Sequence, residues 1–148
     1  MQINFSKACE EALSVMMLHP VLVVEDDFCY YDVSDNYIAM NIEDACSEKE
    51  LFYSVVEELL PNARNYNLIL WSLLHEYGHY MDDLSTWNDE TDQMLRLMTK
   101  ALPNSDDKVL AYFHLPSEMV ATQWAAEFIE RFPELCEKAN AILEPYVE

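Results

Sequence analysis

The segment YNLILWSLLHEYGHYM, residues 66–81, sets the architecture that we expect of this chain. Before His75 it is apolar on nearly every side of a helix, and a helix of that kind is normally buried all round. Its second half contains the pattern HExxH, as HEYGH at 75–79. The segment therefore predicts a buried, central helix that carries two histidines and a glutamate into the core.

His75 and His79 have the spacing needed to share one metal ion. Residues four apart in a helix differ by only about 40° in direction, so both imidazoles can reach the same cation. Glu76 is turned about 100° aside, beside a metal-bound water, where a general base takes its proton. The alternative is that both histidines are core residues bonded to carbonyl groups, although burying unpaired polar groups costs several kcal/mol.

A catalytic zinc site needs a third protein ligand and one open position. The extended metzincin motif would require glycine at 82 and histidine at 85, but the chain has Asp82 and Ser85 there. Glu118 is the best candidate, because small residues on its helical face would let its helix approach the motif helix closely. These small residues are Ala121, Thr122 and Ala125. His114 also competes for this position, and Asp82 and Asp83 remain alternative ligands.

Gly78 is the chain's only glycine. P-loops and dinucleotide-binding motifs need several glycines where the backbone approaches phosphate, so both are excluded. Because Gly78 lies within HEYGH, a side chain there would crowd the metal face or whatever packs on it. The position of this glycine within the motif therefore counts against the alternative of two ordinary core histidines.

The charge of the chain is strongly acidic. Eight basic and 28 acidic residues give a formal net charge of −20, which repels phosphate backbones and disfavours direct nucleic-acid binding. The hydrophobic content of 51% is nevertheless enough for a core, and the length of 148 residues predicts one domain, residues 1–148. An acidic surface suits basic partners, metal cations, or mimicry of nucleic acid.

The compartment that we expect is the cytoplasm. The chain shows no secretory signal and no apolar stretch of the ~20 residues that span a bilayer, so we expect no membrane contact. Its cysteines form no CxxC pair and are expected to be free, buried thiols. They are Cys9, Cys29, Cys46 and Cys136.

Periodicity along the chain predicts an α+β fold. Segments of β-branched and aromatic residues predict three strands in a small, mostly antiparallel meander, at residues 21–24, 28–33 and 37–42. Ser47 and Glu50 form a capping-box pattern that predicts a helix ending before Pro61. Further helices are expected at residues 5–18, 66–81, 94–102, 117–131 and 133–146, while 109–115 is ambiguous.

Two segments together resemble a known family. LLHEYGHYMDD, residues 73–83, followed by PSEMVATQWAAEFIERFP, residues 116–133, is similar to the ImmA/IrrE-type metallopeptidases, gluzincin-like proteins with HExGH followed by a glutamate-bearing helix. The resemblance covers roughly two thirds of the chain. It implies a minimal zincin, with helices packed on the small sheet and the HExxH helix central. Its implied zinc ligands are His75, His79 and Glu118, with Glu76 as general base.

The chain departs from the family pattern at two positions. Val120 replaces a usual second glutamate, and Thr122 replaces a usual Asn or Asp, which weakens the expected support of a metal-bound histidine. Just upstream of Glu118, Tyr112 and His114 are candidate donors to the oxyanion formed during peptide hydrolysis. The alternative for these two is a packed tyrosine and a surface histidine.

These observations give two hypotheses of function. The first is a zinc metallopeptidase whose partner is a protein or peptide substrate; the resemblance implies cleavage of an intracellular regulatory protein such as a transcriptional repressor. The second is an acidic DNA mimic or antitoxin-like binding protein with a structural or vestigial metal site. The sequence does not determine the oligomeric state.

Overall fold

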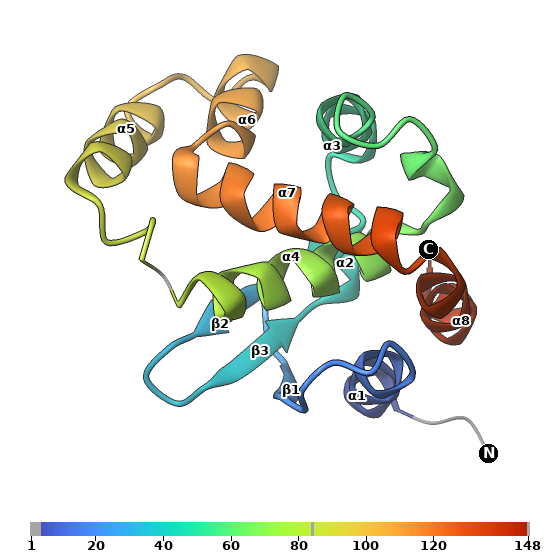
Figure 1. The fold of residues 1–148 in the computed structure, drawn as a ribbon. Coiled ribbons are helices and arrows are strands. Elements are labelled where there is room, and N and C mark those ends of the chain that lie inside the picture. Colours follow the sequence, from blue (N-terminus) through green and yellow to red (C-terminus); the bar gives the residue numbers. More distant parts are fainter. Residues whose placement is uncertain (1–3, 84, 148) are drawn as a thin grey trace.

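The computed structural model describes residues 4–83 and 85–147 and has an α+β fold (Figure 1). Within these residues it contains a three-stranded sheet, eight α-helices and two short 3-10 helices. The strands are β1 Leu22–Glu25, β2 Tyr30–Asp32 and β3 Tyr37–Met40. The helices are α1 Phe5–Val15, α2 Ile42–Ala45, α3 Lys49–Val56, α4 Leu68–Asp82, α5 Glu90–Lys100, α6 Asp106–Phe113, α7 Pro116–Arg131 and α8 Pro133–Leu143.

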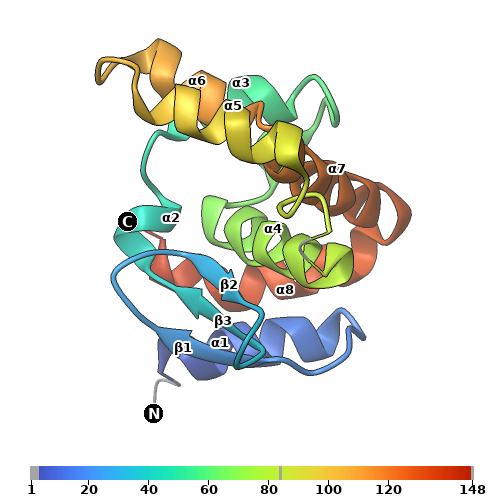
Figure 2. The ribbon, with the colours of Figure 1, turned by 90° about the vertical axis from the view of Figure 1, so that its left-hand side faces the viewer.

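The sheet is mixed, so the prediction of a mostly antiparallel meander is wrong. Its strand order is β1-β3-β2, with β1 parallel and β2 antiparallel to β3 (Figure 2). The middle position belongs to β3 because its residues Ile38, Ala39 and Met40 are all fully buried, whereas β1 and β2 each carry more exposed side chains. The most apolar strand is thereby covered by a neighbour on both edges.

Helix α4 confirms the helix predicted at 66–81. It is capped at its start by Asn67, whose side chain accepts a hydrogen bond from the Leu70 amide at 2.9 Å, and at its end by Asp83, which is in a left-handed conformation. Ten of its residues are buried, as its apolar character requires. It contacts β2 and β3 of the sheet as well as α2, α7 and α8 (Figure 1). The helices predicted at 5–18 and 117–131 correspond to α1 and α7, although α1 ends at Val15, three residues earlier than predicted.

The region before α4 differs from the prediction in two ways. Instead of extending the strand to residue 42, the chain forms α2, because Asn41 accepts a hydrogen bond from the Asp44 amide and caps a helical turn. The capping box is also absent: α3 begins after Glu48, which is left-handed and makes no side-chain cap, while the Ser47 hydroxyl donates to the Asp44 carbonyl.

Helices α5 and α6 form a separate layer on the far side of the molecule from the sheet (Figure 2). Segment 109–115, ambiguous in sequence, lies largely within α6, whose start is capped by Ser105. In α5 the buried residues are the polar Asp92, Arg96 and Thr99. The large apolar side chains of this helix instead face solvent: Met94, Leu95, Leu97 and Met98.

No helix in the described part of the chain combines the length and the apolar character needed to cross a membrane.

Candidate metal centre

Helices α4 and α7 pack so closely that their backbones touch at Gly78. A Cβ atom at position 78 would lie 2.7 Å from the carbonyl oxygen of Ala121 and 2.9 Å from its Cα. On the α7 side the atoms in contact belong to Ala121, and Ala125, one turn further along, is likewise small and buried. The single glycine and this small-residue face thus bring the first turn of α7, which carries Glu118, against the motif helix.

Gly78→Ala is expected to destabilise the protein by about 2 kcal/mol. Overpacking costs up to about 3 kcal/mol, and alanine in a helix gives back about 1 kcal/mol relative to glycine. Urea unfolding monitored by circular dichroism would measure the difference. Because the clash is with main-chain atoms of Ala121, adding Ala121→Gly should not rescue stability. Full rescue by that second change would contradict the proposed contact.

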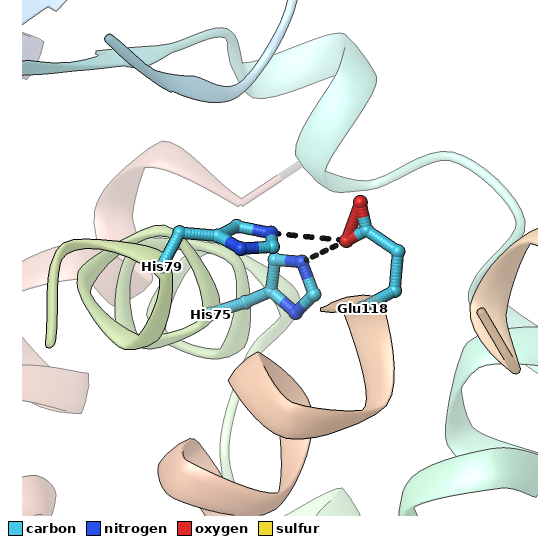
Figure 3. A group of neighbouring side chains, drawn as sticks. All are labelled: His75, His79 and Glu118. Atoms are coloured by element: carbon cyan, nitrogen blue, oxygen red, sulfur yellow. Dashed lines mark hydrogen bonds and ion pairs between the residues drawn. The ribbon is translucent and has the colours of Figure 1, made fainter. Parts of the chain in front are cut away.

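The structure brings together the three side chains that the sequence nominates as ligands. Glu118 Oε2 lies 2.9 Å from His75 Nε2 and 3.0 Å from His79 Nε2. Figure 3 shows the two imidazoles of α4 and the carboxylate of α7 pointing toward one another. Asp82 and Asp83, the alternative ligands, lie outside this group at the end of α4, where the Asp82 carboxylate accepts a hydrogen bond from the Thr86 amide.

The donor set has a geometry that a metal ion can use. One ligand atom from each of His75, His79 and Glu118 lies within 4.8 Å of the other two. Tetrahedral zinc, with bonds of about 2.0–2.1 Å, sets its ligand atoms about 3.4 Å apart. The two nitrogen–oxygen distances of 2.9 and 3.0 Å would need to open by about 0.4 Å, and the two imidazole nitrogens, up to 4.8 Å apart, would need to approach each other by up to about 1.4 Å. Rotation of these side chains would let the group hold a metal ion.

Charges at the site are strongly coupled. Burial alone would raise the pKa of Glu118, but its hydrogen bonds to His75 and His79 and their charges hold that pKa well below its usual range. Burial would lower the pKa of His75, yet the hydrogen bond to Glu118 and its negative charge raise it. Without a metal, the negative charge of Glu118 therefore favours the protonated, positively charged form of the His75 imidazole.

Thr122 supports His75 from the opposite side of the ring. Its Oγ1 lies 3.0 Å from His75 Nδ1, so a threonine hydroxyl reaches the nitrogen that an Asn or Asp would be expected to hold. His79 Nδ1, by contrast, is buried and has no hydrogen-bond partner among the described residues. The two histidines thus differ in how firmly their rings are oriented.

Glu76 lies beside this group and faces a cavity of about 820 Å³. Burial raises the pKa of its carboxyl group, and no described residue forms a hydrogen bond with it. The cavity is also lined by His75, Glu118 and the aromatic side chains of Phe52 and Phe113. Glu76 is therefore a buried carboxylate that can exchange a proton with a molecule in the cavity.

The two candidate oxyanion donors lie in different places. The Tyr112 hydroxyl donates to Glu118 Oε1 at 3.0 Å, and Tyr112 lines the cavity. His114 is exposed and is not part of the cavity wall; its Nδ1–H donates to the Leu110 carbonyl at 2.7 Å. The structure thus brings Tyr112, but not His114, to the site.

Sequence reasoning missed a buried polar cluster around Glu118. Arg96 of α5 donates to the Ser117 hydroxyl at 2.8 Å and lies 3.5 Å from Glu118 Oε1, and Asp92 accepts a hydrogen bond from the Ser117 amide at 2.7 Å. The only signal in the sequence is the i,i+4 spacing of Asp92 and Arg96, which is equally typical of a solvent-exposed pair. No feature of the neighbouring sequence indicates that Asp92 and Arg96 face the interior of the protein.

Comparisons of the chain with protein-family models, with curated proteins and with solved structures found no match.

Proposed function

We propose that this protein is a zinc-dependent metallopeptidase with a minimal zincin fold of the ImmA/IrrE type. One observation carries the proposal: His75, His79 and Glu118 converge within 4.8 Å, and His75 and Glu118 line the same cavity as the buried carboxyl group of Glu76. Two imidazoles and a carboxylate are the donor set of catalytic zinc sites in several peptidases. The sequence resemblance, through HEYGH and the α7 glutamate, points to the same class.

Each side chain has a role that follows from its position. His75, His79 and Glu118 would hold the zinc, which when bound lowers the pKa of water and polarises a carbonyl group. Glu76 accepts a proton from the attacking water and returns it to the leaving amine. Its raised pKa suits this exchange, because a base works best when its pKa is near the working pH.

The cavity is of a size that suits a segment of polypeptide. Its volume of about 820 Å³ is within the range of about 300–1,000 Å³ that is usual for ligand sites. Phe52 and Phe113 provide apolar surface for side chains of the substrate. We propose a protein or peptide substrate and, on the resemblance alone, a regulatory protein such as a transcriptional repressor. The four free cysteines favour a reducing compartment such as the cytoplasm.

Metal analysis combined with a cleavage assay tests this proposal. The purified protein is expected to carry one zinc per chain and to cleave members of a peptide library. A chelator should abolish cleavage, and added zinc should restore it. A protein that takes up no divalent metal, or whose cleavage persists after complete chelation, would contradict the proposal.

The alternative of an acidic DNA mimic rests on the net charge of −20. A mimic presents carboxylates over one face and needs no metal group or cavity. It predicts capture of a DNA-binding protein that duplex DNA displaces, and capture that is unchanged in the His75→Ala/His79→Ala double variant when the fold persists. That result, together with no cleavage under any condition, would favour the mimic over the peptidase.

A further inference from the structure

Arg96 is a buried cation placed next to a candidate cation site. Arg96 is only 9% exposed. The short polar contacts of its guanidinium group are all made by one nitrogen, Nη2. That nitrogen lies 2.8 Å from Ser117 Oγ, 3.5 Å from Glu118 Oε1 and 3.7 Å from Asp92 Oδ2. A positive charge this close to the Glu118 carboxylate repels a metal ion bound by that carboxylate. The presence of Arg96 next to the candidate ligand therefore requires a structural reason.

The first turn of α7 depends on α5 for its hydrogen bonds. The residue preceding α7, Leu115, has no side-chain cap to offer, and the first amides of a helix lack partners within it. Asp92 of α5 supplies one, because its Oδ1 accepts a hydrogen bond from the Ser117 amide at 2.7 Å. Arg96, one helical turn after Asp92, binds the Ser117 side chain. Asp92 and Arg96 together hold in place the first turn of α7, which carries Glu118.

The two oxygens of Glu118 are held from opposite directions. Oε2 faces the imidazoles of His75 and His79. Oε1 accepts a hydrogen bond from Tyr112 at 3.0 Å and lies 3.5 Å from Arg96. The carboxylate therefore has one oxygen for the metal group and one for the cluster on α5 and α6.

Aromatic rings fix the guanidinium plane itself. Its central carbon lies 3.7 Å from the centroid of the Trp87 ring and 5.6 Å from that of Tyr112. A planar guanidinium stacks on rings and directs its donors at fixed angles, whereas a lysine ammonium does neither. The site thus constrains the direction of the Arg96 donors as well as their charge.

We propose that Arg96 is a positioning residue, which holds the Ser117–Glu118 turn so that Glu118 Oε2 is presented to His75 and His79. This inference rests on the proposed metal site and adds the device that orients its third ligand. The positioning role and the charge of Arg96 have opposite effects. Removal of a nearby positive charge strengthens cation binding, whereas loss of an outer contact to a ligand typically weakens it by 10- to 100-fold.

Cobalt binding to the metal-free protein tests the proposal. Arg96→Leu is expected to weaken Co²⁺ binding roughly 10- to 100-fold and to change the visible absorption bands, which report ligand number and geometry. Arg131→Leu is the matched control: it removes an exposed arginine from the other end of α7, about 20 Å from Glu118 at 1.5 Å per residue. Its affinity and absorption bands should match those of the wild type.

Arg96→Lys keeps the positive charge and provides a second, milder variant in case Arg96→Leu does not fold. Positioning by the guanidinium predicts weaker Co²⁺ binding in Arg96→Lys, whereas an effect of charge alone predicts wild-type affinity. Unchanged or tighter binding with unchanged bands, in either folded variant, would overturn the proposal. A wild-type protein that binds neither Co²⁺ nor Zn²⁺ would instead refute the metal site itself, so the two failures are distinguishable.

Discussion

Glu76→Gln is expected to slow peptide hydrolysis by roughly 10²- to 10⁴-fold, the usual contribution of a general base. The amide keeps the size and shape of the side chain but cannot accept the proton of the attacking water. Since Glu76 is not among the three converging ligands, the variant should retain one zinc per chain. Removal of a buried carboxylate with no hydrogen-bond partner among the described residues should leave the unfolding midpoint equal to or above that of the wild type.

Three measurements on the same preparation separate these effects: initial rates on a cleaved peptide, zinc content, and thermal unfolding. Glu127→Gln, an exposed change on α7, is the matched control and should behave as the wild type in all three. An unchanged rate in Glu76→Gln would show that Glu76 is not the base and that the cleavage comes from another group or from a contaminating enzyme.

Glu118→Gln is expected to weaken zinc binding by more than about 100-fold, because even outer contacts to a metal ligand are worth 10- to 100-fold. The variant loses a full ligand and its negative charge. Two imidazoles then remain without their shared carboxylate, whose Oε2 lies about equally close to both. Competition with a chromophoric chelator measures the affinity, and zinc retained after desalting gives an independent reading.

The comparison variant is Asp82→Asn, which changes the strongest alternative ligand. The Asp82 carboxylate is occupied by the Thr86 amide and the Ser85 and Thr86 hydroxyls, so this variant should keep wild-type zinc affinity. The reverse pattern, with zinc lost from Asp82→Asn and kept by Glu118→Gln, would reassign the third ligand.

Local spacing made much of the site predictable. The positions of His75 and His79 follow from helical geometry alone, and the approach of Glu118 follows from small residues on one face of its helix. Both arguments concern residues within one or two turns of each other. The Gly78–Ala121 contact is the point at which these two local patterns meet in space.

Features that depend on distant partners were not predictable in the same way. The strand order β1-β3-β2 reflects which strand buries most apolar surface, and alternation within each strand does not encode that ranking. The inward direction of Arg96 is set by Ser117 and Glu118, more than 20 residues further along the chain. A pair of opposite charges four residues apart, such as Asp92 and Arg96, has the same sequence pattern whether the pair faces solvent or a metal ligand.

The orientation of α5 also bears on how this helix tolerates mutation. Met94, Leu97 and Met98 are 64%, 68% and 60% exposed, so replacing any of them with glutamine should change the unfolding free energy by no more than about 0.5 kcal/mol. Arg96 and Asp92, which a hydrophobicity plot would assign to the surface, should tolerate very little. Along α5 the apolar positions would then be the tolerant ones and the charged positions the sensitive ones, which is the reverse of an ordinary amphipathic helix. A score that treats hydrophobic positions as the important ones would rank the positions of α5 in the wrong order.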